Sequence, residues 1–288
     1  MSINRGPTLR AQWLGEQLRM LRDAAGLNLR EVGGYLRRDA STISRFETGT
    51  YPPRMEDVEA LLNFYQVTDA KRRQVLERLT RDVWQKGWWD GYSGEVFKSM
   101  IDYAWLESRA EEIRAFQPIV VPGLLQTRGY AEAVMRAADP DQPDSQIERW
   151  LELRLLRQHV VTTAKTQLSV ILDEAVLRRP VGDAGVMAEQ LDRLAEAAQR
   201  SNVALRVLPA EAGAHASPDG AFKVFVMPEP FPVLVCIETP AGAIYVEHDG
   251  VDPFAARYRL LEKISLGPEK SVALVSAAAE QMRRSRRR

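Results

Sequence analysis

Side chains suited to chemistry gather in the short stretch formed by residues 39–47, which reads DASTISRFE. If Ile43 and Phe46 face a protein core, small hydroxyl side chains and one arginine lie on the opposite side of a helix. Serine and threonine reach base edges or phosphates of DNA, and arginine pairs with the acceptor atoms of guanine in the major groove. The stretch therefore predicts a DNA-reading face made of Ala40, Ser41, Thr42, Ser44 and Arg45.

Three further arginines, Arg37, Arg38 and Arg54, flank this helix in the sequence. Guanidinium groups beside a reading helix suit phosphate contacts, which fix the register of a protein on the duplex and carry no sequence information. We therefore expect these three arginines to position the reading face without adding to its base preference.

A reading helix this short must share its apolar side with neighbouring helices. Val32 and Leu36 are four residues apart and predict a preceding helix, for which Asn28 is placed as the N-cap. Asp39 is placed to cap the reading helix in the same way. Gly33 predicts a close approach of two backbones, since glycine inside a helix otherwise costs about 1 kcal/mol relative to alanine. Together these features predict a helix-turn-helix.

Three more amphipathic helices complete a predicted five-helix domain over residues 9–83. One spans residues 9–25 and ends at Gly26, one follows Pro53, and one begins near Asp69. A single unit of this kind reads one half-site, and a symmetric pair reads two half-sites about one helical turn apart. We therefore expect a homodimer on double-stranded DNA with a pseudo-palindromic operator.

The run ASTISRFETGTYPP resembles the recognition-helix segment of lambda-repressor-like, or XRE-type, helix-turn-helix regulators. The resemblance implies that Ala40, Ser41 and Arg45 occupy base-reading positions and that Glu47 is structural. Arg37 departs from the family pattern, in which the turn usually holds glycine. The alternative interpretation of the same pattern is an ordinary helical hairpin.

Charge is distributed unevenly along a chain whose formal net charge is zero. Residues 1–54 hold nine arginines against five acidic residues, residues 55–282 hold 25 basic against 34 acidic residues, and residues 283–288 hold five arginines. This pattern predicts a basic reader, an acidic body and a disordered basic tail over residues 283–288, and only a basic region suits contact with phosphate.

Length and composition indicate the class of protein. A chain of 288 residues is long for one domain, which predicts two. The single cysteine, Cys236, excludes an internal disulfide and favours a reducing compartment. No apolar run approaches the roughly 18 residues of a membrane span, and we expect a cytoplasmic, nucleoid-associated protein without membrane contact.

Tryptophan is concentrated in residues 84–96, a predicted Trp-rich linker with Trp84, Trp88 and Trp89. We expect these rings to pack one domain against another, and a base-stacking platform is the alternative. Residues 97–282 then predict a mixed α+β domain that closes with an antiparallel β-meander. Its expected helices are 102–116, one from Thr127, 145–160, one around 187–194, 252–265 and 268–282; its expected strands are 167–172, 203–208, 222–227, 233–237 and 243–247.

The segments LESRAEEIRAF, VPGLLQTRGYAEAVM and LDEAVLRRPVGDAGVMAEQLDRLAE resemble the C-terminal domain of WhiJ-like actinobacterial regulators, often discussed as antitoxin-like. The resemblance implies a partner such as a small acidic BldB-like protein, and supplies no catalytic residues. We therefore expect a transcription regulator whose C-terminal domain dimerises and senses that partner or a small-molecule effector. One alternative is an antitoxin-like protein that sequesters a partner and autoregulates its operon, and another is an enzyme with a DNA-binding appendage.

Other candidate sites are weaker. His215 and His248 lie near acidic residues, but no spacing typical of metal ligands is present, so we predict no metal and no catalytic centre. Glycine-rich phosphate loops are also missing from the sequence, so no nucleotide cofactor is expected. A ligand pocket bounded by residues 122–127, residues 212–219 and Glu238 is a hypothesis, because polar residues follow predicted strands there.

Overall fold

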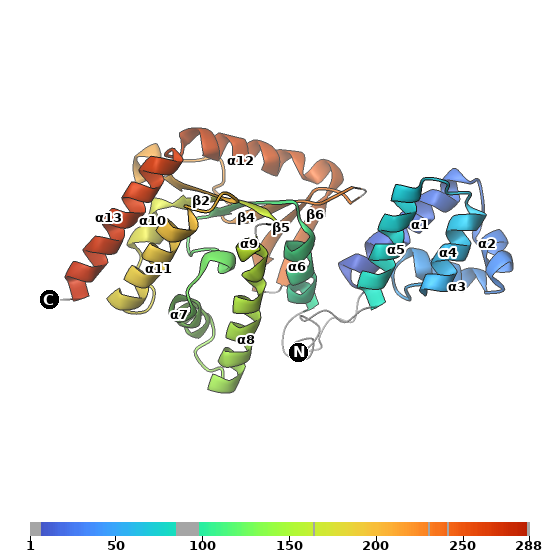
Figure 1. Cartoon of the computed structure of the whole chain (residues 1–288), viewed down its shortest axis with the longest axis horizontal. Helices are drawn as coiled ribbons and strands as arrows, with labels where there is room; N and C mark the ends of the chain where they lie inside the picture. The colour runs from blue at the N-terminus through green and yellow to red at the C-terminus, as the bar shows by residue number, and fades with distance from the viewer. Residues whose placement is uncertain (1–6, 85–97, 164, 230, 241, 287–288) are drawn as a thin grey trace. The chain divides into compact units, whose positions relative to one another are not determined.

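The computed structural model describes residues 7–84, 98–163, 165–229, 231–240 and 242–286 (Figure 1). The chain divides into two compact units, Met1–Asp102 and Tyr103–Arg288. Trp88 and Trp89 of the predicted linker lie outside the described residues, as do the last two arginines of the predicted tail.

The first unit contains the five predicted helices. Most of the apolar positions chosen from the periodicity are buried, among them Leu14, Val32, Ile43, Phe46 and Val58, each at most 1 % exposed. The helical hairpin and its three supporting helices therefore share one core. The helices are α1 (Leu9–Ala24), α2 (Leu29–Leu36), α3 (Ala40–Glu47), α4 (Met55–Phe64) and α5 (Ala70–Trp84).

The second unit is built on a six-stranded sheet with strand order β3-β2-β1-β4-β5-β6. Strands β1, β2 and β3 pair in parallel, and β4, β5 and β6 form the predicted antiparallel meander, with β4 antiparallel to β1. The mixed α+β architecture is therefore confirmed. The strands are β1 (Glu112–Gln117), β2 (Gln167–Asp173), β3 (Val203–Leu208), β4 (Phe222–Val226), β5 (Leu234–Thr239) and β6 (Gly242–Glu247).

The predicted helix over residues 102–116 is wrong in its second half. Helix α6 (Lys98–Arg109) ends early, and β1 then takes a central place in the sheet between β2 and β4. The residues EIRAFQ include good helix formers, but β2 and β4 pair with both edges of this strand. In this central place Ile113, Ala115 and Phe116 are at most 1 % exposed. Tertiary context outweighs local propensity here.

Helices cover both faces of this sheet (Figure 1). Tyr258 and Leu261 of α12 pack on one face, in a core cluster with Phe116 and Phe222. Tyr103 of α6 meets Phe225 on the other face, with ring centroids 5.7 Å apart. The remaining helices are α7 (Arg128–Ala138), α8 (Asp144–Arg157), α9 (His159–Thr162), α10 (Glu174–Arg178), α11 (Ala184–Ala197), α12 (Asp252–Ile264) and α13 (Pro268–Arg286), with short 3-10 turns η2 (Gly123–Leu125), η3 (Ala210–Ala212) and η4 (His248–Gly250).

The C-terminal end of the described chain is more ordered than expected. Helix α13 continues to Arg286, and Arg283 forms an ion pair with Asp192 of α11. Residues 283–286 are therefore helical, which corrects the prediction that the basic tail is disordered from its first residue. Among the described residues, no helix is long and apolar enough to cross a membrane.

Candidate nucleic-acid interface

Helix α3 presents the predicted face. Ile43 and Phe46 are each 1 % exposed. On the opposite side Ser41 and Arg45 are exposed, while Ala40, Thr42 and Ser44 are partly buried. The Arg45 guanidinium lies over its own helix, where Nε donates to the Ser41 carbonyl and Nη2 to Thr42 Oγ1, both at 3.4 Å. Bonds this long are weak, so the guanidinium is available to another acceptor.

Helices α2 and α3 are capped differently at their N-termini. Asn28 Oδ1 accepts from the Arg30 and Glu31 amides at 2.9 and 3.0 Å, and the Glu31 carboxylate accepts from the Asn28 amide at 2.7 Å. This reciprocal cap confirms the predicted start of α2. Asp39 holds the N-cap position of α3, but its side chain makes no capping bond. Its backbone carbonyl instead accepts from the Thr42 amide at 2.9 Å, so the predicted side-chain cap is wrong.

The turn between α2 and α3 combines a close approach with an unusual backbone conformation. A Cβ atom on Gly33 would lie 2.6 Å from the Arg38 carbonyl oxygen, which confirms the predicted close approach of two backbone segments. Arg37 ends α2 in the left-handed region, with φ of 56°. A non-glycine residue there costs roughly 1–2 kcal/mol, which explains why glycine is the usual choice.

Two glycines missed by sequence reasoning bring α1 against the end of α3. A Cβ atom on Gly15 would lie 2.4 Å from the Glu47 carbonyl oxygen and 2.5 Å from that of Phe46. Gly49 has φ of 70°, and its Cβ atom would lie 2.6 Å from the Ala11 carbonyl carbon. Gly15 could have been found from the sequence, because a glycine inside a predicted helix usually marks a close packing contact.

A partly buried ion pair fixes the same end of α3. Arg22 Nε donates to Glu47 Oε1 at 2.6 Å and Arg22 Nη2 to Glu47 Oε2 at 3.0 Å, while Arg22 Nη1 donates to the Leu27 carbonyl at 2.8 Å. The hydrogen bond to Glu47 raises the pKa of Arg22. The pair ties α1, the turn before α2 and the end of α3 together, which fits a structural role for Glu47.

The flanking arginines differ in their surroundings. The Arg38 guanidinium makes two bonds to Asp57 Oδ1, at 2.9 and 3.2 Å, and a third to Oδ2 at 3.2 Å, so Asp57 of α4 already engages this cation. The Arg54 guanidinium stacks 4.0 Å from the centroid of the Trp84 ring, and Trp84 Nε1 donates to the Pro53 carbonyl at 2.7 Å. Trp84 therefore packs within the first unit.

A hollow of about 550 Å³ opens at the start of α4. A helix N-terminus attracts anions, because its first amides are unpaired and the helix dipole is positive there. Arg81 adds a second cation that sequence reasoning did not select. The hollow is lined by Arg54, Met55, Glu56, Thr80, Arg81 and Trp84.

Comparison with protein families assigns both parts of the chain. The family described as "Domain of unknown function (DUF5753)" matches residues 100–277, which is more than half of the chain. The chain belongs to the DUF5753 family. A family described as "Helix-turn-helix domain" matches residues 13–75, and points to a DNA-binding regulator. Neither the curated proteins nor the solved structures contain a significant match.

The DUF5753 domain does not assemble the hypothetical pocket of residues 122–127, residues 212–219 and Glu238. Ala212 and Ala216 pack on the core beneath α12, and the His215 ring lies 5.2 Å from that of Phe116. Glu238 instead pairs with Lys223, which also donates to Tyr103 on the other face of the sheet. Because successive strand residues point to opposite faces, the sheet separates the loop of residues 212–219 from Glu238.

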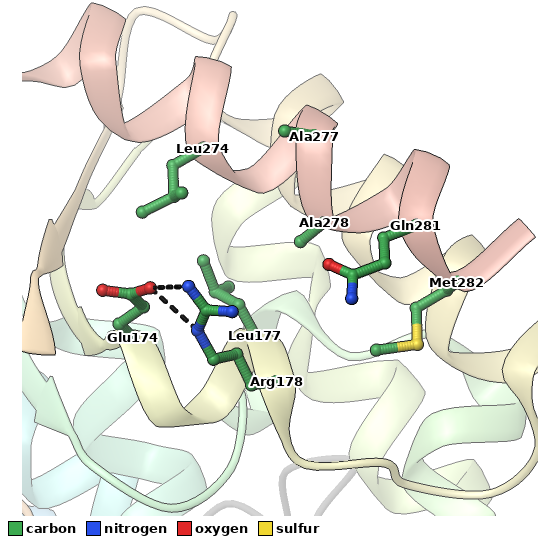
Figure 2. A pocket seen from close by; sticks show the side chains of 8 residues that line it. All are labelled: Glu174, Leu177, Arg178, Leu274, Ala277, Ala278, Gln281 and Met282. Atoms are coloured by element: carbon green, nitrogen blue, oxygen red, sulfur yellow. Dashed lines mark hydrogen bonds and ion pairs between the residues drawn. The ribbon is translucent and has the colours of Figure 1, made fainter. Parts of the chain in front are cut away.

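A groove of about 150 Å³ lies between α10 and α13 of the DUF5753 domain (Figure 2). Leu177, Leu274 and Met282 supply most of its apolar lining. Its charged residues satisfy each other, since Arg178 donates to Glu174, whose other oxygen accepts from the Ala210 amide at 2.9 Å. The lining therefore shows no preference for a particular ligand.

Proposed function

We propose that the chain is a sequence-specific transcription regulator in which residues 9–83 read DNA through α3. The outward face of α3 carries this proposal: Ser41 and Arg45 are exposed on a helix whose other side is anchored by buried Ile43 and Phe46. A helix held in this way enters the major groove with its N-terminal half. Ala40, Ser41, Thr42, Ser44 and Arg45 would then meet base edges or adjacent phosphates.

The flanking cations would hold the phosphate backbone. Arg37 is exposed at the turn before α3, and Arg54 stands at the N-terminus of α4 beside Arg81. Arg38 shares its charge with Asp57, so its phosphate contact would be the weakest of the predicted three. These contacts would add affinity that falls as salt rises, and little sequence preference.

Regulation would come from the DUF5753 domain. Residues 97–282 would form the region that dimerises and senses a small molecule or a partner protein, and residues 84–96 would link it to the DNA-reading domain. Two copies would place two α3 helices on a pseudo-palindromic site. A ligand that prefers one arrangement of the two readers changes operator affinity only by the difference in its affinity for the two arrangements.

Selection from a random duplex library tests the reading face. The full chain should enrich one motif with two related half-sites. The Arg45→Ala variant should lose about 1–3 kcal/mol of discrimination at one base position in each half-site. The Arg19→Ala variant removes the same charge from an exposed position on α1 and should keep the motif. No enriched motif, or an unchanged motif with Arg45→Ala, would contradict the proposal.

A further inference from the structure

Trp84, the last residue of α5, is held against the start of α4. Its Nε1 donates to the Pro53 carbonyl at 2.7 Å, and the Arg54 guanidinium lies 4.0 Å from the centroid of its ring. The Trp84 side chain is 37 % exposed, so this contact lies at the surface of the first unit. The hydrogen bond fixes the ring beside the chain that carries Arg54, and the face of the ring holds the guanidinium by a cation–π contact.

Stacking leaves the Arg54 guanidinium able to bind an anion. A guanidinium that packs by its face keeps its N–H groups at its edge, where phosphate oxygens can accept from them. Arg38 shows the opposite case, because its N–H groups donate to the Asp57 carboxylate at 2.9 and 3.2 Å. Trp84 therefore restricts the position of Arg54 without using its hydrogen-bond donors.

The hollow beside Arg54 favours an anion. Its volume of about 550 Å³ lies within the range of roughly 300–1,000 Å³ that is usual for ligand sites. Two arginines, Arg54 and Arg81, line it together with one acidic residue, Glu56. Arg81 is exposed and precedes Trp84 by three residues on α5. A phosphate group in the hollow would therefore meet two guanidinium groups, which suits a contact with the DNA backbone.

The Asp57 carboxylate places this hollow beside the reading helix. It accepts from the Arg38 guanidinium, and its Oδ2 also accepts from the Arg54 amide at 3.3 Å. Arg38 directly precedes Asp39, the N-cap residue of α3. One carboxylate thus ties the start of α3 to the start of α4. When the N-terminal half of α3 enters the major groove, Arg54 would lie at the border of the groove, where backbone phosphates are the nearest groups.

We propose that Trp84 is a positioning residue for DNA binding: the face of its ring holds the Arg54 guanidinium in place for contact with a backbone phosphate. This inference rests on the function proposed above and adds to it a residue that acts through Arg54. Trp84 itself carries no charge. Its removal changes the salt dependence of binding only through a cation that it positions, because that dependence reflects the number of phosphates that cations neutralise.

Two substitutions of Trp84 form a matched pair. Trp84→Leu and Trp84→Phe both lose the hydrogen bond to Pro53, and only Trp84→Phe keeps an aromatic face beside Arg54. Fluorescence anisotropy measures binding of the full chain to the duplex enriched in the selection above, between about 50 and 200 mM salt. Arg54→Ala should reduce the magnitude of the slope of log affinity against log salt by about 1. Trp84→Leu should reduce it by roughly half as much and weaken binding about two- to fivefold, whereas Trp84→Phe should keep the wild-type slope.

The same pair in the Arg54→Ala background separates positioning from a structural role. Trp84→Leu should then leave the slope unchanged and the affinity within about twofold, because the cation that Trp84 positions is missing. All variants are compared at a temperature at which circular dichroism shows them fully folded.

Three results would overturn the role of Trp84. The first is a loss of affinity that is equal in both backgrounds and leaves the slope unchanged, since a structural role predicts it. The second is the same slope for Trp84→Leu and Trp84→Phe. The third is a wild-type chain that binds no duplex, which would contradict the proposed function as well, whereas the first two would leave the reading face of α3 untouched.

Discussion

Three exposed arginines near α3 and the buried Arg157 of the DUF5753 domain occupy contrasting environments. Arg37, Arg45 and Arg54 are exposed, whereas Arg157 is 5 % exposed and enclosed by Glu107 and Tyr103. An exposed guanidinium contributes little to stability and remains available to a phosphate or a base. A buried one depends on its carboxylate partner, because the desolvated charge has no other compensation. The exposed arginines therefore suit the DNA contacts proposed for them, whereas Arg157 holds the DUF5753 domain together through its carboxylate partner.

The largest effect should come from breaking the buried pair. Glu107→Gln leaves Arg157 without a carboxylate partner, and should destabilise the DUF5753 domain by about 3–5 kcal/mol in denaturant unfolding followed by circular dichroism. Glu148→Gln breaks an Arg–Glu pair that is about half exposed, between Glu148 and Arg128, and should leave the unfolding curve unchanged. Equal effects of the two substitutions would show that burial does not separate the two classes of arginine.

A smaller effect should come from the contact that positions the reading helix. Gly15→Ala places a methyl group against the backbone of Phe46 and Glu47, and should destabilise the first unit by about 1–3 kcal/mol. Operator affinity should fall with it, since the end of α3 must shift. Gly34→Ala, a helical glycine with nothing within 4 Å of the added atom, should instead stabilise by about 0.5–1 kcal/mol. If the two variants have the same stability, the close approach of α1 and α3 is not required.

The features that could be predicted from the sequence depend on residues that lie close together in the chain. The faces of α2 and α3 and the Asn28 cap depend on residues within one or two helical turns, and periodicity reveals them directly. The three strands of the meander are also separated by short turns, so their order follows from the chain itself.

The strand and the contacts that the sequence did not predict depend on residues that lie far apart in the chain. Strand β1 exists because β2 and β4, which lie more than 50 residues further along the chain, pair with both of its edges. The contact of Gly15 with Glu47 and the pair of Glu107 with Arg157 likewise join separate elements. No spacing within a single helix predicts such contacts, so the pairing of Glu107 with Arg157 could not be inferred from the sequence alone.

The smallest effect should come from Arg37, where protein stability and the salt dependence of DNA binding can be measured separately. Arg37→Gly relieves a left-handed backbone conformation, and should stabilise the first unit by about 0.5–1 kcal/mol after the entropy cost of glycine is included. Loss of one phosphate contact should also reduce the slope of log affinity against log salt by about 1. Gln66→Gly relieves the same conformation after α4, where φ is 54°, and should raise stability without changing the slope. An unchanged slope for Arg37→Gly would show that Arg37 makes no phosphate contact. The exposed arginines would then fall into two groups, those that bind DNA and those that only face solvent.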